Sequence, residues 1–337
     1  MRELAALVML AAAAGCAAAS DETSAELPAT APPTSAAAAA VVRTADPVAR
    51  GLTDADFPRL QELAGGVYSY EQLRSAGDER FTTVSLFVVT SEGVLVADGQ
   101  GNAEETQRLI DTIATITDQP ITHVVICSDH GDHTGGNRAF PDSATFIAHP
   151  TSAAVLEASA ARAAEREGSA PVRVAEELVA DQRVLQLGGR EIRILFLGRA
   201  HTGGDLNVYL PAEKVLFMSE AFLNRVFPAM RSAYPSEWVA MIERAQAMDV
   251  DVYVPGHGFV ESPEVLEEEL EVYRQALQQV IDEARRLHEA GASVEEAIEQ
   301  ASFGELESWT IRSSQGPTAI RQVYRELNGE LPAGGGR

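Results

Sequence analysis

Residues 128–137 read Ser-Asp-His-Gly-Asp-His-Thr-Gly-Gly-Asn and are rich in side chains of the kinds that bind metal ions. The preceding residues, Ile121 to Cys127, are rich in β-branched side chains and predict a strand. His130, Asp132 and His133 therefore lie on a glycine-rich loop at the edge of a sheet, where side chains can converge. Imidazole and carboxylate groups are the usual nitrogen and oxygen ligands of zinc and similar ions.

Two further histidines also follow predicted strands and have glycine neighbours. His201 lies in the segment 198–205, between two strand-like stretches, and His257 comes just after the strand-like Val252–Val254. Three such segments, each at the end of a strand, indicate a metal site rather than unrelated structural histidines. The remaining histidines are not expected to bind metal. His123 is predicted to be packed or exposed at a sheet edge, His149 to lie in a loop, and His288 to be solvated on a helix.

The composition excludes several classes of function. The 337 residues include 26 Lys and Arg against 50 Asp and Glu, which gives a net charge of −24. This charge repels phosphate backbones and anionic lipid surfaces, so neither nucleic-acid binding nor electrostatic membrane docking is expected. Two cysteines cannot form a disulfide framework or a cysteine-rich zinc site. Strand alternation points Cys127 away from the metal-facing side, so we expect a core thiol.

The order of predicted elements favours an α/β (α+β) fold. Pairs of strands, a helix, a strand and a helix occur and then recur, which suits a four-layer αββα sandwich of two mixed sheets. Residues 51–260 would form this domain, residues 261–330 a C-terminal helical extension, and residues 331–337 a flexible tail. The strongest predicted elements are strands at 82–89, 94–97, 191–197 and 215–218, and helices at 103–116, 152–167, 236–248 and 262–290.

The first residues predict an export signal. A basic start is followed by the apolar run Leu4 to Ala14, which is too short to span a bilayer, and then by Gly15 and Cys16. This end resembles the lipobox of bacterial lipoproteins, which implies a signal peptide at 1–16 and lipidation of Cys16. An ordinary secretory signal with an incidental cysteine is the alternative. The Ala-, Pro- and Thr-rich residues 17–50 predict a disordered tether. We therefore expect a protein exported to the bacterial periplasm or cell envelope, with the lipid anchor as its only membrane contact.

Over roughly residues 60–260 the motifs resemble those of the metallo-β-lactamase superfamily. That family has a His-x-His-x-Asp-His motif followed by Gly-Gly, then a His, then an Asp or Cys after a strand, and finally Gly-His. Here Ser128 stands in place of the first motif His, and Glu220 stands in place of the bridging Asp. The resemblance implies that Asp98 supports the site from behind, although a plain turn carboxylate is the alternative. The positions that match the family's ligands are His130, Asp132, His133, His201 and His257.

The resemblance implies one or two zinc ions, while iron or manganese remain alternatives. One ion would be held by Asp132, His133 and His257. The other would be held by His130 and His201, with Ser128 as a weak ligand or water completing the set. Glu220 would bridge the two ions. All three residues of the first set match the family motif, so the ion that they would hold is expected to be the more firmly bound of the two.

The implied activity is hydrolysis of an amide, ester, thioester or lactone in a small molecule, and a β-lactam is one possible substrate. A bound ion lowers the pKa of its water towards ~7, and Asp132 would orient the resulting hydroxide. Just past Glu220, Asn224 and Arg225 are candidate substrate-binding residues; Arg225 or Arg231 could hold a substrate carboxylate, or be a surface charge. A metal- or ligand-binding protein without turnover is the main alternative, and a redox enzyme ranks last. The sequence leaves the oligomeric state open.

Overall fold

The strands pair into one sheet that curls back on itself. The computed structural model describes residues 42–165 and 172–332. Within them, a sheet of 12 strands runs in the order β7-β6-β5-β4-β3-β12-β11-β10-β9-β8, with β2 also paired to β3 and β1 paired to β2. The strands are β1 (Arg59–Ala64), β2 (Val67–Ala76), β3 (Glu79–Thr90), β4 (Gly93–Ala97), β5 (Ile121–Ile126), β6 (Thr145–Ala148), β7 (Glu177–Leu178), β8 (Gln182–Leu187), β9 (Arg190–Leu195), β10 (Asn207–Leu210), β11 (Val215–Leu223) and β12 (Val252–His257).

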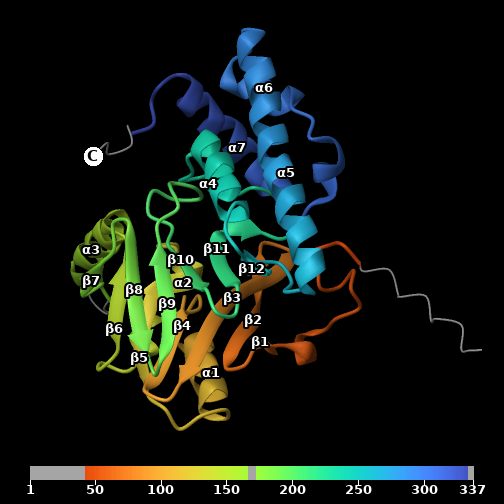
Figure 1. The fold of residues 1–337 in the computed structure, drawn as a ribbon. Coiled ribbons are helices and arrows are strands. Elements are labelled where there is room, and N and C mark those ends of the chain that lie inside the picture. The colour runs from red at the N-terminus through yellow and green to blue at the C-terminus, as the bar shows by residue number, and fades with distance from the viewer. Residues whose placement is uncertain (1–41, 166–171, 333–337) are drawn as a thin grey trace, which may run out of the picture. The chain divides into compact units, whose positions relative to one another are not determined.

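Helices cover both faces of this sheet (Figure 1). Those of the sandwich are α1 (Ala103–Ala114), the single turn α2 (Gly131–Thr134), α3 (Pro150–Ala164) and α4 (Pro235–Gln246). The C-terminal ones are α5 (Pro263–Glu289), α6 (Val294–Gln300) and α7 (Arg312–Leu327). The helices α4, α5 and α7 gather beside β11 and β12 (Figure 1). No described helix is both long enough and apolar enough to cross a membrane.

Alternate side chains of the central strands enter two different hydrophobic cores. Phe87 of β3 and Val96 of β4 pack in one core with Leu109 of α1, whereas Leu86 and Leu95 pack in the core that includes β10, β11 and α5. Burial of both faces explains why β4 and residues 86–89 of β3 are continuously apolar. The predicted αββα class is therefore confirmed, and Cys127 is a buried free thiol in the second core.

Two separate sheets were predicted, but in the structure they are joined into one. Strand β3 is 12 residues long, so it pairs with β2 and β4 and still reaches β12. The recorded register between β3 and β12 is the single pair Thr83–His257. A candidate ligand thus lies on the seam between the two halves of the sheet.

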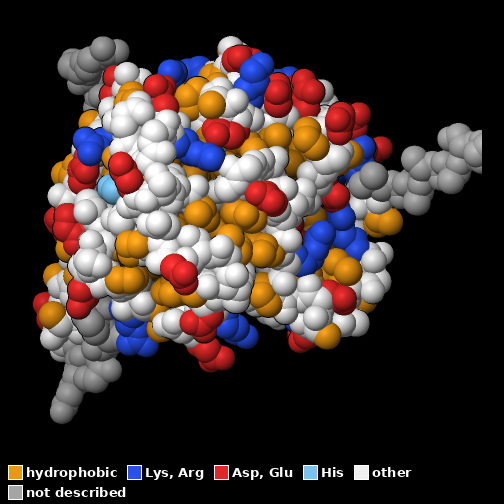
Figure 2. All heavy atoms as spheres, turned by 60° about the horizontal axis from the view of Figure 1, so that its bottom comes forward, with side chains coloured by type: hydrophobic (Ala, Val, Ile, Leu, Met, Phe, Trp, Pro, Cys, Tyr) orange, Lys and Arg blue, Asp and Glu red, His pale blue; other side chains and the backbone are white. Residues whose placement is uncertain are grey.

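Surface charges of both signs are interspersed with apolar side chains on the face shown in Figure 2.

The local sequence pattern predicts neither strand β1 nor the full length of strand β11. The predicted strand 215–218 in fact continues to Leu223, so Glu220 lies within a strand rather than at its end.

The described end of the predicted tether, residues 42–50, packs on the domain. Ala45 is buried, and Arg43 donates to the Glu269 carboxylate at 2.7 Å. Likewise, Pro332 in the predicted tail accepts a hydrogen bond from Arg199. The predicted signal peptide, Cys16, residues 17–41 of the tether and residues 333–337 of the tail lie outside the described residues.

The Glu269 carboxylate yields a stability prediction. It is buried on α5 between Arg43 and Arg225, whose Nη2 lies 2.9 Å away, while its neighbour Glu268 is exposed. Replacing Glu269→Gln leaves Arg225 without its buried counter-charge, so the free energy of unfolding should fall by about 2 kcal/mol or more. Urea unfolding measures this change.

The matched control is Glu268→Gln, which removes an exposed partner of the same Arg43 and should cost less than about 1 kcal/mol. Equal effects of the two substitutions would contradict the structural role given to Glu269.

Candidate metal centre

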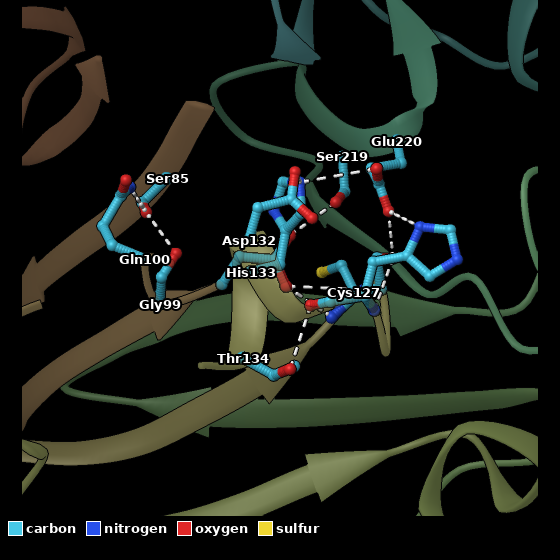
Figure 3. A network of polar contacts seen from close by, with 12 residues as sticks. Ser85, Gly99, Gln100, Cys127, Asp132, His133, Thr134, Ser219 and Glu220 are labelled. Atoms are coloured by element: carbon cyan, nitrogen blue, oxygen red, sulfur yellow. Dashed lines mark hydrogen bonds and ion pairs between the residues drawn. The ribbon is translucent and has the colours of Figure 1, made fainter. Parts of the chain in front are cut away.

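Four chain segments deliver the predicted ligands to one place. His130 is the residue before α2, and Asp132 and His133 lie in its single turn, just after β5. His201 lies in the connection from β9 to β10, Glu220 lies in β11, and His257 ends β12. In Figure 3, Asp132 and His133 of α2 lie across from Ser219 and Glu220 of β11.

Glycines allow the close backbone approaches that this arrangement needs. A Cβ on Gly256 would overlap the backbone of Ser219 and Glu220, so β12 can pass against β11 at this point only without a side chain. Ser219 itself has φ +48°, and the β11–β12 register shifts beside it. This irregularity in β11 lies directly before Glu220.

The side chains form two groups that share Glu220. One group is Asp132, His133, Glu220 and His257, and the other is His130, His201 and Glu220; the candidate ligand atoms within each group lie within 4.8 Å of one another. The Nε2 atoms of His133 and His257 are 3.3 Å apart, and His201 Nε2 is 2.9 Å from His130 Nδ1. All six predicted ligands other than Ser128 are therefore brought together.

The donor set fits a divalent cation. Imidazole nitrogens that face each other at these distances cannot both carry a proton, so at least one nitrogen of each pair turns a lone pair toward the space between them. Nitrogen and carboxylate oxygen are the ligands that zinc accepts, and three or four protein ligands per ion is the usual number at a catalytic zinc site.

Polar partners behind the ligands fix their orientation. The Nδ1 atom of His257 lies 2.8 Å from the carbonyl oxygen of Thr82, which leaves Nε2 facing the centre. Asp98 lies 3.1 Å from Nδ1 of His133, and it accepts hydrogen bonds from the Cys127 backbone N–H at 2.7 Å and from the Ser219 hydroxyl. Such partners hold a metal-binding imidazole in one tautomer. Asp98 therefore lies behind the candidate ligands, where the family resemblance places it.

Ser128 lies against the carboxylate that the two ligand groups share. Its hydroxyl donates to Oε2 of Glu220 and accepts from the backbone N–H of His130 at 3.3 Å. Ser128 is thus a hydrogen-bonding partner of Glu220, and its role as a weak ligand stays a prediction.

The electrostatics of the centre are dominated by the Glu220 carboxylate. Burial acts to raise the pKa of Glu220, but the charges of His201, His130 and His133 outweigh it and hold the pKa well below its ordinary value. Burial acts to lower the pKa of His130, but the Glu220 charge raises it to about 9. For His257, burial is outweighed by hydrogen bonds to Asp132 and Glu220, which raise its pKa to about 9.

Asp132 remains ionised in this setting. Burial and the Glu220 charge act to raise its pKa, whereas the hydrogen bond from His257 and the charge of His133 bring it below the ordinary value. Its Oδ2 lies 3.1 Å from His257 Nε2 and 3.5 Å from Nη1 of Arg74.

A cavity of about 240 Å³ opens onto the ligands. One wall is apolar, and two arginines and two polar side chains complete it. Apart from the ligands, its lining is Arg74, Ala76, Phe81, Leu223, Val226, Ala229, Arg231, Ile311, Gln315 and Thr318. Sequence reasoning missed Arg74 of β2 and the α7 residues, since nothing in their local pattern points to the site.

The two proposed substrate-binding residues after Glu220 do not line this cavity. Asn224 is buried and donates to the carbonyl oxygen of Phe259 at 2.8 Å, and Arg225 pairs with Glu269. The alternative candidate, Arg231, does line it. The non-ligand assignments fit the structure: His149 accepts from Thr151 N–H at the start of α3, and His288 contacts Asn328 at 3.0 Å.

The raised pKa values predict that protons compete with the metal. Since the folded-state pKa values of His130 and His257 lie above 6.5, protonation stabilises the metal-free protein. That stabilisation is complete below about pH 6.5 and is lost as the pH rises through about 9. Zinc needs both rings unprotonated, so its affinity should fall as the pH falls below 9, and binding at pH 7 should release protons.

Titration calorimetry in buffers of different ionisation enthalpy counts these protons. His288→Gln, which lies far from the ligands on α5, should leave the count unchanged. Binding without proton release would contradict the assignment of these two histidines.

Comparisons with known proteins agree with this geometry. The family model of the metallo-β-lactamase superfamily matches residues 78–257, which is more than half of the chain. The chain is 23% identical over 242 residues to the 2,4-dinitroanisole O-demethylase subunit alpha of a Nocardioides species, covering 70% of this chain and 68% of that protein. It is 25% identical over 209 residues to a type 2 metallo-β-lactamase of Bacillus cereus, covering 60% of this chain and 77% of that one.

Among solved structures, the sec-alkylsulfatase Pisa1 of a Pseudomonas species matches with a TM-score of 0.61 and 18% identity. The match covers 81% of this chain but only 50% of Pisa1, so the chain spans about half of that protein. This likeness concerns the fold. With the family motif, the ligand constellation and the curled sheet in agreement, the chain belongs to the metallo-β-lactamase superfamily of hydrolases.

Proposed function

We propose that this protein is a zinc-dependent hydrolase that cleaves an amide, ester, thioester or lactone bond in a small molecule. The observation that carries the proposal is the Glu220 carboxylate shared between two groups of ligands. One or two zinc ions held there would activate water and polarise the bond under attack. The group Asp132, His133 and His257 is the more complete, so it would hold the first ion.

The residues around the ligands suit this role. Asp132 is ionised and anchored by His257 and Arg74, so it can both bind an ion and accept a hydrogen bond from the attacking water. Phe81, Leu223 and Ile311 form an apolar part of the cavity lining, and an apolar wall strengthens electrostatic interactions next to it.

The lining favours a substrate with an anionic group and a compact apolar part. Arg231 is exposed at the cavity, and Arg74 lies at its Asp132 end. A guanidinium binds a carboxylate or a sulfate through paired hydrogen bonds. A sulfate ester is therefore a second candidate substrate, supported by these arginines and by the alkylsulfatase among the structural relatives.

We also propose export to the cell envelope with a lipid anchor on Cys16. The support is the order of basic start, apolar run and Gly15-Cys16 in the sequence.

Metal removal tests the proposed reaction. A chelator should abolish hydrolysis of 4-nitrophenyl acetate or a chromogenic cephalosporin by residues 42–337, and added zinc should restore it. Asp132→Asn should lower kcat/KM by about a hundredfold or more, because it removes a ligand and a charge. Asp118→Asn, on the exposed loop after α1, is the matched control. Zinc-loaded protein that turns over neither these substrates nor 4-nitrophenyl sulfate would favour the binding-protein alternative.

Arg231 gives a prediction about substrate charge. Arg231→Gln should raise KM for the anionic ester mono-4-nitrophenyl succinate by about tenfold or more, since a charged hydrogen bond contributes about 1.5–3 kcal/mol. The neutral ester 4-nitrophenyl acetate should be unaffected. Exposed Arg138, which does not line the cavity, provides the control Arg138→Gln. Equal changes for both esters would show that Arg231 does not recognise the anion.

A further inference from the structure

We propose that Ser128 and Glu220 are a matched pair, in which the Ser128 hydroxyl positions the longer carboxylate so that Glu220 fills the ligand place of the absent histidine. The inference rests on the proposed metal centre but not on turnover. It treats the two departures from the family motif as one structural solution rather than two separate losses. Ser128 is then a positioning residue, not a ligand.

The contacts of the two carboxylate oxygens carry the proposal. Oε2 of Glu220 accepts from the Ser128 hydroxyl and lies 3.0 Å from His130 Nδ1. Oε1 faces the rest of the centre, 3.2 Å from His201 Nε2 and 3.3 Å from His257 Nε2. One oxygen thus serves the centre shared by the two groups, and the other lies on the side where residue 128 approaches.

The hydrogen bonding of Ser128 fixes the direction of its proton. Its Oγ accepts from the His130 backbone N–H, so the hydroxyl hydrogen is left to donate to the Glu220 carboxylate. The Ser128 backbone N–H lies 3.4 Å from Asp98, which also anchors Ser219. The donor at 128 and the residue before Glu220 are therefore held by one carboxylate.

The available space requires a short side chain at 128 when Glu is at 220. Ser128 is wholly buried and does not line the cavity, so a larger side chain has no open space to enter. An imidazole would extend from the position of Oγ into the Glu220 carboxylate. Aspartate at 220 would withdraw that carboxylate by roughly 1.5 Å, the length of one carbon–carbon bond. The β11 backbone cannot shift to compensate, because Gly256 already packs against Ser219.

A double-mutant cycle tests this coupling, with bound zinc per chain and the thermal midpoint as readouts. The variants are Ser128→His, Glu220→Asp and the two together, each loaded with zinc and dialysed before elemental analysis. We expect about two ions in the wild type, about one in each single variant, and about two again in the double variant, with parallel loss and recovery of the midpoint. Cys127→Ala, a buried neighbour outside the ligand groups, controls for general loosening of this chain segment and should keep both ions.

Ser128→Ala provides a test that does not depend on fitting a larger side chain. Losing the hydroxyl should weaken the more weakly bound zinc by about tenfold in a competition titration with a chromophoric chelator. Unchanged affinity in Ser128→Ala would overturn the positioning role. Two tightly bound ions in Ser128→His alone, or additive losses in the double variant, would overturn the pairing. Because these readouts are metal content and stability, a wild type that binds zinc without hydrolysing any substrate would refute the proposed function and leave this inference standing.

Discussion

The buried carboxylate of Glu220 is the group on which the rest of the centre depends. An ionised carboxylate without partners in the interior costs several kcal/mol, and here its charge is matched by contacts with His130, His201 and His257. The same charge raises the pKa of His130 and contributes to raising that of His257. In the metal-free protein, protonated imidazoles balance the carboxylates, and cations would take over that balance when the centre is loaded.

The fold places this carboxylate through backbone contacts rather than through flexible loops. Glu220 lies in β11, its neighbour Ser219 is tied to Asp98, and β12 presses against both through Gly256. The pair Thr83–His257 then joins the two halves of the sheet at a ligand. A change in the packing of either half therefore moves ligands relative to one another, which links the stability of the sandwich to the geometry of the centre.

The sequence predicts which histidines come together because each of them lies where a strand ends or a glycine-rich turn begins, and such signals are local. His130, Asp132, His133, His201 and His257 all follow this rule, whereas Glu220 was predicted only through the family resemblance. The substrate side was harder to predict. Arg225 was a plausible anion-binding residue until the fold brought Glu269, 44 residues away, against it. Arg74 reaches the cavity because the fold brings its guanidinium close to Asp132, which is 58 positions further along the chain, and no local pattern reveals this.

The candidate metal ligands and the wall that faces them across the cavity come from different parts of the chain. The ligands lie in or next to the sheet, but part of the facing wall belongs to the start of α7, where Ile311, Gln315 and Thr318 line the cavity. Ile311 adopts φ +60°, a left-handed conformation that a β-branched residue rarely takes. Its backbone N–H donates to Glu79 at 2.7 Å, and the preceding Thr310 pairs with Val226. Contacts on both sides thus hold a strained residue against the cavity, as is common where a ligand is gripped. Changes in this C-terminal segment can alter the shape of the substrate wall without touching the residues that would hold the metal.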